Sequence, residues 1–308
     1  MKKILLGQVG DTEIRLLRVF KAVADCGGMA AAELELNIGC STVSRHIKDL
    51  EERLGLVLCY RGRAGFALTA EGQKIYEATV HLIEALESFR LDVGDMHAEL
   101  VGNLRLGIFD KTVTNPNALL DRAIRDFRCK APEVKLDITV GAINSIENAV
   151  MSGQLHLGIL PYHRRSSSLD YHELFSEEMY LYCGAEHPLY IADYTALTWE
   201  TIQSYDYAGL SFHSPNMDAA HRFRLSRQAS VSDQEAVATL ILSGCYIGFL
   251  PEHYAALFVE QKLMRKIEHA ECMYHVQFVA IQRCSPPPSR ITQAFLNSLY
   301  VIHRKEVI

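Results

Sequence analysis

The feature that most constrains the fold is a pair of short helical patterns joined by a tight turn, in residues 30–54. Residues 37–39, Asn-Ile-Gly, interrupt the first pattern, and the glycine is an acceptable N-cap for a second helix. Apolar residues of the second pattern recur every three or four positions, at Val43, Ile47, Leu50 and Leu54. That spacing places them on one face, so we predict an amphipathic second helix.

The opposite face of this second helix is polar and locally basic. Two small hydroxyl residues, Ser41 and Thr42, stand near its start, and Arg45 and Lys48 follow one and two turns later. Short side chains let a helix approach the major groove of DNA closely, and arginine pairs bidentately with guanine. The alternative is an ordinary helical hairpin whose polar face is solvated.

The segment after this helix favours the DNA-reading alternative. Gly55 ends the helix, and residues 56–60 and 66–68 have the composition of two short strands. The predicted turn between them carries Arg61 and Arg63 at its tip. A basic hairpin directly after a groove-entering helix is typical of a wing that contacts phosphates or the minor groove.

Residues 14–72 resemble the winged helix-turn-helix of LysR-type transcriptional regulators. The matching residues fall at the family's spacings: Ser44-Arg45, Leu50-Glu51, Leu54-Gly55, Arg61, Leu68-Thr69 and Glu71-Gly72. The chain departs from the family pattern at three positions, since Met29 and Cys59 replace a common Phe and Cys40 replaces a frequent Gln. The candidate DNA contacts are Ser41, Thr42, Ser44, Arg45, Lys48, Arg61 and Arg63.

The charge distribution is consistent with an N-terminal DNA-binding segment attached to an acidic remainder of the chain. The 308-residue chain has a net charge of −6, with 49% hydrophobic and 22% charged residues, as soluble globular proteins have. Residues 1–69 contain ten Lys or Arg and eight Asp or Glu, a balance of +2, which leaves −8 for the remainder. Phosphate contacts are therefore expected to be few and confined to one face.

Motifs for other protein classes are missing. The eight cysteines form no CxxC pair, so we expect core thiols; a redox sensor, which needs an exposed activated pair, is the alternative. The thirteen histidines show no metal-ligand spacing, and no nucleophile or nucleotide motif occurs, which predicts no metal, cofactor or catalytic residue. The early end of the first apolar run and the lack of a long apolar segment predict a cytoplasmic protein without a membrane partner.

Thr69 is expected to cap a long helix that ends near residue 100. Its apolar residues form a stripe: Ile75, Tyr76, Val80, Ile83, Leu86, Phe89, Val93 and Met96. Such a helix is about 40 Å long at 1.5 Å per residue, so a compact domain does not bury the whole stripe. We expect the same helix of a second subunit to cover it, as the family resemblance also implies; packing against its own subunit is the alternative.

The rest of the chain alternates strands with helices, which predicts parallel sheets covered by helices. We predict strands at 104–108, 134–140, 155–160, 179–183, 208–212, 246–250, 263–267 and 274–281, and helices at 117–130, 145–152, 216–228, 233–243, 252–259 and 289–303. The two α/β halves resemble a type 2 periplasmic-binding-protein fold, which is also the effector domain of LysR-type regulators. Residues 187–189 and 244–251 match that family's pattern.

These observations predict three domains and one ligand site. The domains are a winged helix-turn-helix at 1–68, a linker and dimerisation helix at 69–101, and an effector domain at 102–308, with subdomain I at about 102–163 and 268–308 and subdomain II at about 164–267. In open α/β sheets ligands bind beyond the carboxyl ends of strands. The candidate effector contacts at such ends are Asp110, Lys111, Thr112, Ser145, Tyr162, Phe212 and His213.

The chemistry of these candidates favours an anionic effector. Lys111 suits a carboxylate or phosphate, although it is equally a candidate for a solvated loop residue, and Ser145 begins a predicted helix whose amides face an anion. The resemblance implies that Thr112 and Ser145 match positions where family members commonly contact their effector.

We therefore expect a regulator, not an enzyme, that binds double-stranded promoter DNA as a homodimer or homotetramer, is switched by a small effector and has RNA polymerase as a candidate partner. A solute-binding protein built on the same α/β body, and an enzyme on that body, are the alternatives.

Overall fold

The computed structural model describes residues 9–62, 65–94, 100–194, 197–269 and 272–305. The chain forms two compact units, Met1–Met96 and His97–Ile308. None of the helices in the described residues combines the length and the hydropathy needed to cross a membrane.

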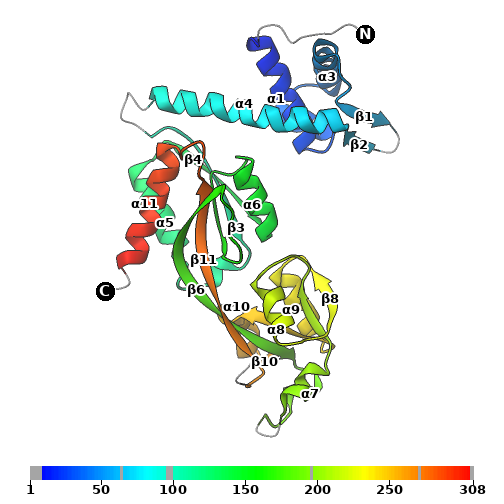
Figure 1. Cartoon of the computed structure of the whole chain (residues 1–308), viewed down its shortest axis with the longest axis vertical. Helices are drawn as coiled ribbons and strands as arrows, with labels where there is room; N and C mark the ends of the chain where they lie inside the picture. The colour runs from blue at the N-terminus through cyan, green and yellow to red at the C-terminus, as the bar shows by residue number, and fades with distance from the viewer. Residues whose placement is uncertain (1–8, 63–64, 95–99, 195–196, 270–271, 306–308) are drawn as a thin grey trace. The chain divides into compact units, whose positions relative to one another are not determined.

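The first unit contains the predicted winged helix-turn-helix (Figure 1). Its elements are α1 (Asp11–Asp25), α2 (Met29–Leu36), α3 (Cys40–Leu54), β1 (Cys59–Gly62), β2 (Gly65–Leu68) and α4 (Ala70–Gly94). The strands β1 and β2 pair antiparallel, with Cys59 opposite Leu68. The apolar faces of α1 and α3 meet in one core, whose fully buried members include Leu16, Phe20, Val23, Val43, Ile47 and Leu58.

Local chemistry sets the ends of these elements. Asn37 takes a left-handed conformation with φ 51° and ends α2, and Gly55 does the same with φ 67° after α3. Thr69 caps α4 as predicted, because its hydroxyl oxygen accepts from the Gly72 amide at 2.8 Å. The same hydroxyl donates to the Val57 carbonyl at 2.7 Å, which fastens α4 to the segment before the wing.

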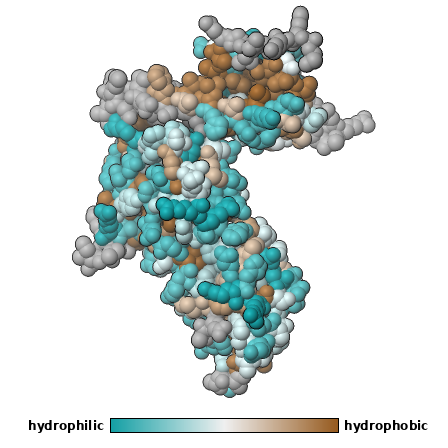
Figure 2. All heavy atoms as spheres, in the orientation of Figure 1, coloured by the Kyte–Doolittle hydropathy of each residue, from teal (hydrophilic) through white to brown (hydrophobic). Residues whose placement is uncertain are grey.

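Helix α4 is covered along only part of its apolar stripe. Val80 is buried, and Ile75 and Tyr76 pack against the core of this unit. Phe89, further along the helix, is 65% exposed, whereas the side chains of Val93 and Met96 lie outside the described residues. Figure 2 shows apolar side chains gathered on the visible face of this unit, while the visible face of the second unit is mostly hydrophilic.

The second unit is built on one mixed sheet (Figure 1). Its strands are β3 (Gly102–Phe109), β4 (Val134–Gly141), β5 (Leu157–Pro161), β6 (Leu169–Gly184), β7 (Tyr207–Leu210), β8 (Arg227–Val231), β9 (Ile247–Pro251), β10 (Met264–Lys266) and β11 (Met273–Arg283). They follow the order β4-β3-β5-β11-β6-β9-β7-β8, with β10 paired to β6. The strands β3, β4 and β5 are mutually parallel, as are β7, β8 and β9, which confirms parallel strands within each half.

Helices cover the two ends of this sheet. The first half carries α5 (Leu120–Lys130), α6 (Ile143–Met151) and α11 (Arg290–Lys305), and the second carries α7 (Trp199–Gln203), α8 (Pro215–Arg222), α9 (Gln234–Leu242) and α10 (Glu252–Glu260). The two halves are α/β subdomains of the expected type 2 periplasmic-binding-protein-like architecture.

Two long antiparallel strands join the halves, and the sequence-based prediction found only part of them. Strand β6 spans 16 residues and pairs with β11 from Leu169 opposite Arg283 to Tyr180 opposite Met273. We predicted a strand only at 179–183, because the mostly polar residues 170–178 carry no apolar alternation. The predicted helix at 216–228 was also too long, since β8 begins at Arg227.

Candidate nucleic-acid interface and ligand pocket

Helix α3 separates its structural face from its candidate DNA-reading face. Val43, Ile47 and Leu50 are at most 1% exposed and face the core. The predicted contacts divide by burial: Ser41, Arg45 and Lys48 are exposed, whereas Thr42 and Ser44 are half-buried. Gly39 is the N-cap, as predicted, and its carbonyl accepts from the Thr42 and Val43 amides at 2.8 and 3.1 Å.

The side chain of Arg45 is available for a ligand. Among the described residues it makes no hydrogen bond or ion pair. Lys48 lies 3.7 Å from Glu52 in an exposed pair, which contributes little to stability and gives way readily. The outward face of α3 therefore offers one exposed arginine that none of the described residues binds.

The wing prediction is described only in part. The hairpin is present, and the backbone of Arg61 lies opposite Phe66 in it. The side chain of Arg61 and the whole of Arg63 lie outside the described residues. Tyr60, which we did not select from the sequence, is 63% exposed on β1.

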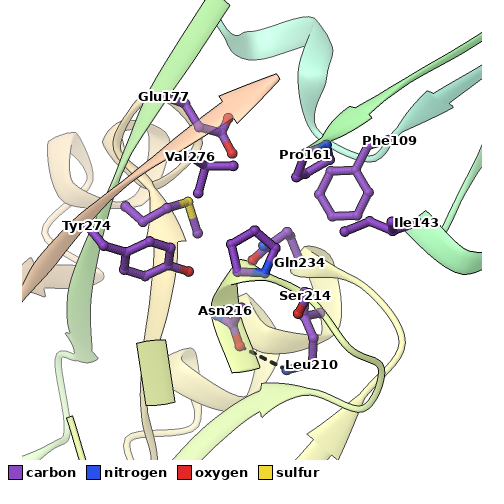
Figure 3. Close-up of a pocket in the computed structure, with 12 residues that line it drawn as sticks. Phe109, Ile143, Pro161, Glu177, Leu210, Ser214, Asn216, Gln234, Tyr274 and Val276 are labelled. Carbon is purple, nitrogen blue, oxygen red and sulfur yellow. Dashed lines mark hydrogen bonds between the residues drawn. The ribbon is translucent and has the colours of Figure 1, made fainter. Parts of the chain in front are cut away.

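A pocket lies in the second unit, between the two α/β halves (Figure 3). Its walls come from β3, α6 and β5 of the first half, from β7, α8 and α9 of the second, and from the joining strands β6 and β11. The lining residues are Phe109, Ile143, Pro161, Glu177, Met179, Leu210, Ser214, Pro215, Asn216, Gln234, Tyr274 and Val276. The space among them is narrow and partly open to solvent.

Comparison with known proteins identifies both units. Residues 14–73 match the model of bacterial regulatory helix-turn-helix proteins of the lysR family, and residues 97–300 match the model of the LysR substrate binding domain. The chain belongs to the LysR family of transcriptional regulators. It carries a DNA-binding domain followed by an effector-binding domain of this family.

Individual relatives agree with this assignment along the whole chain. The regulator is 38% identical over 296 residues to the HTH-type transcriptional activator BauR of Pseudomonas aeruginosa, covering 96% of this chain and 97% of that protein. Its fold resembles that of CbnR, a LysR family transcriptional regulator, with a TM-score of 0.66, 19% identity and coverage of 94% and 99% of the two chains. Full-length CbnR bound to its target DNA gives a TM-score of 0.65 at 21% identity, with the same coverage.

In this LysR-type regulator the loop after β3 ties the two halves together at the rim of the pocket. The Asp110 carboxylate accepts a hydrogen bond from the backbone N–H of Gln234 at 2.8 Å, and Lys111 Nζ lies 2.7 Å from Glu235 Oε2. Both partners belong to the first turn of α9. Neither of these two predicted effector contacts lines the pocket. Both side chains instead connect the first half to α9 of the second half.

The other predicted effector contacts lie close to the pocket without lining it. Thr112 is buried, and its hydroxyl donates to the Phe109 carbonyl at 2.6 Å. Ser145 is an exposed residue in the first turn of α6, and Tyr162 is 41% exposed against Tyr171.

Phe212 and His213 immediately precede the lining residue Ser214. Phe212 is half-buried, and the exposed His213 ring lies 5.4 Å from the ring of His163.

The polar residues that do line the pocket were missed by the sequence reasoning. Asn216 and Gln234 stand in the first turns of α8 and α9, a few residues beyond the strand ends that the rule for α/β sheets selects. Glu177 and Tyr274 lie on β6 and β11, and no motif marks them. The strand-end signal therefore selected side chains that neighbour the pocket along the chain and did not select those that line it.

Asp110 is expected to make stability depend on pH. Burial raises its pKa from the usual 3.8 to about 6, although the Gln234 amide and Lys111 lower it in part. Because the pKa of Asp110 is higher in the folded protein than in the unfolded chain, protonation of Asp110 favours the folded state. This stabilisation is fully present at about pH 4 and below, and it is lost as the pH rises through about 6. Asp110→Asn keeps an oxygen that accepts from Gln234, so it should flatten this decline and raise unfolding free energy at neutral pH by about 1–2 kcal/mol.

Thermal unfolding followed between about pH 4 and 7 measures this effect, with Asp121→Asn on the exposed surface of α5 as the matched control. A decline that stays equally steep in Asp110→Asn would contradict the assignment to Asp110.

Proposed function

We propose that α3 reads promoter DNA through Arg45 and Ser41, with Thr42, Ser44 and Lys48 beside them and Arg61 and Arg63 on phosphates or in the minor groove. The observation that carries this proposal is the outward face of α3, where Arg45 is exposed and has no partner among the described residues. An unpaired arginine on a helix with small neighbours meets the requirements of direct readout.

Two copies of the chain are proposed to bind two half-sites. The support is the partly uncovered stripe of α4, where Ile83 and Leu86 are half-buried and Phe89 is 65% exposed. Burying this stripe against a second α4 removes apolar surface from water and pairs the two readers. This surface supports the proposal of a dimer, from which a tetramer of two dimers can form, and RNA polymerase is a candidate partner of the DNA-bound assembly.

The pocket is proposed to hold the effector that switches the regulator. Asp110, Lys111 and Thr114 reach from one half to α9 and α10 of the other, so a ligand between the halves changes how firmly they are tied. A ligand that binds one arrangement of the halves better shifts the population toward it. The proposed DNA-binding domain ends at residue 68, the linker helix ends at residue 101, and the subdomain limits of the effector domain lie at about 163 and 267.

The alternative functions receive no comparable support. A solute-binding protein does not require the DNA-reading face of α3, and the family is one of transcriptional regulators. We propose no catalytic role and place the regulator in the cytoplasm, where promoter DNA is present.

Binding to the DNA upstream of the protein's own gene tests the function. Titration of the labelled duplex should give an affinity about a thousandfold above that for a shuffled duplex of equal length, as specific readers show. Footprints should cover two half-sites separated by whole helical turns, because a symmetric dimer meets one face of DNA. Equal affinity for both duplexes, or a single protected half-site, would contradict the proposal.

A further inference from the structure

The pocket between the halves has a buried polar wall. Glu177 and Tyr274 are 7% exposed, Asn216 is 3% exposed and Gln234 is 2% exposed. Figure 3 shows these side chains around the space, with Glu177 on one side and Asn216 on the other. Polar groups buried to this degree normally have hydrogen-bond partners, so an unpaired group on this wall is available to a ligand.

Three of these four residues hold polar atoms without a partner. Gln234 Oε1, Asn216 Nδ2 and the Tyr274 hydroxyl make no hydrogen bond of normal geometry in the described part of the chain. The side-chain oxygen of Asn216 accepts from the Tyr207 hydroxyl at 2.9 Å and from the Leu210 amide at 3.2 Å, which fixes its amide nitrogen on the side of Tyr274. That nitrogen interacts with the Tyr274 hydroxyl and lowers its pKa in part, so the hydroxyl keeps its own proton for an acceptor on a ligand.

The charge of the wall is negative at the Glu177 end. The side chain of Glu177 is 4% exposed, and its Oε2 faces His253 Nε2 at 3.0 Å and accepts from Asn115 Nδ2 at 3.4 Å. No Lys or Arg stands among the residues that line the pocket. Lys111, the cation at the rim, is occupied by Glu235. A buried carboxylate disfavours a second negative charge and favours a cation, because burial weakens the screening by water.

The opposite end of the pocket presents hydrogen-bond donors. The Asn216 amide nitrogen and the Tyr274 hydroxyl lie there, and both groups can donate to an acceptor on a ligand.

We propose that the pocket binds a small molecule with a cationic nitrogen, such as a primary ammonium or an amidinium, and a hydrogen-bond acceptor at its other end. The cationic nitrogen donates to Glu177, and the acceptor receives hydrogen bonds from Asn216 and Tyr274. This inference rests on the proposed function and names the ligand class of its effector site. It replaces the expectation of an anion held by Lys111.

The same geometry describes how binding is transmitted. Glu177 Oε2 lies 3.0 Å from His253 Nε2, and His253 Nδ1 lies 2.7 Å from Thr114 Oγ1 in the loop after β3. A ligand nitrogen on Glu177 competes with His253, which belongs to α10 of the second half. Binding therefore loosens one of the contacts that join the halves.

Three probes of nearly equal size test the charge of the ligand on the full-length protein. Glycinamide carries an ammonium and an amide, glycolamide replaces the ammonium by a hydroxyl, and malonamate replaces it by a carboxylate. We expect glycinamide to bind roughly tenfold to a hundredfold more tightly than glycolamide, the range of a hydrogen bond to a charged group, and malonamate to bind weakest. Calorimetric titration gives the three dissociation constants.

Two variants locate the effect. Glu177→Gln should bring glycinamide to the level of glycolamide, whereas Glu173→Gln, an exposed position on the same strand, should leave the preference intact. Malonamate binding best, no binding of glycinamide, or an unchanged preference in Glu177→Gln would overturn the inference. If Glu177→Gln does not fold, the wild-type order of the three probes decides. Specific operator binding by a protein that ignores glycinamide would overturn this inference alone, without touching the proposed function.

Discussion

Arg45→Ala is expected to weaken operator binding by roughly tenfold to a hundredfold, the worth of one bidentate arginine–guanine pair. Arg45 is exposed on α3 and has no partner among the described residues, so its removal costs no internal contact. The core beneath it, formed by Val43, Ile47 and Leu50, does not change. Fluorescence anisotropy with operator and shuffled duplexes measures the loss, which should fall mainly on the operator.

Two controls separate base readout from general charge. Arg125→Ala removes the same charge from an exposed position on α5 of the second unit and should leave operator affinity unchanged. Lys48→Ala should weaken both duplexes to a similar extent and reduce the salt dependence by about one phosphate contact. Unchanged operator affinity in a folded Arg45→Ala protein would contradict the role given to α3.

Gly72→Ala is expected to destabilise the first unit strongly, so that it melts well below the temperature at which the wild-type unit melts. A Cβ at Gly72 would lie 1.9 Å from the carbonyl oxygen of Leu58 and 2.8 Å from its carbonyl carbon. Both are backbone atoms, and that oxygen also accepts from the Thr69 amide at 3.0 Å, so neither side yields easily. Alanine alone favours a helix by about 1 kcal/mol, but the clash should exceed 3 kcal/mol and lower the melting temperature of this unit by about 10–20 °C.

The close approach of the Leu58 backbone explains why glycine is needed at position 72, directly after Glu71. Thermal unfolding monitored on the full chain should show an early transition for the first unit and an unchanged transition for residues 97–308. Gly39→Ala is the matched control, because nothing lies within 4 Å of its added Cβ and its φ is −59°. A Gly72→Ala protein as stable as this control would show that α4 does not pack on the wing as described.

The DNA-reading unit could be predicted from the sequence because its determinants are local. The spacing of Val43, Ile47 and Leu50 decides which face of α3 is buried, and Thr69 caps α4 through an amide three residues away. Such signals act within one or two helical turns, so they are visible in the chain itself. The apolar stripe of α4 was predicted to face a second subunit. In the structure, Ile75 and Tyr76 pack against the core of their own subunit, and only the later part of the stripe is uncovered.

The ligand pocket required the tertiary structure. Its polar wall combines Glu177 with Asn216, Gln234 and Tyr274, which come from four separate elements. Strand β6 carries Glu177 in a polar segment whose pairing with β11, about a hundred residues later, stabilises it against the local pattern. The sequence offered Lys111 either as an anion contact or as a solvated loop residue, and the fold adds its ion pair with Glu235 of the other half.

By itself, therefore, the sequence determined the two domain folds and the polar face of α3, because periodicity and capping act over a few residues. Only the tertiary structure decided which polar side chains meet between the halves and what charge they present. Long-range strand pairing brings those residues together, and no spacing along the chain records it.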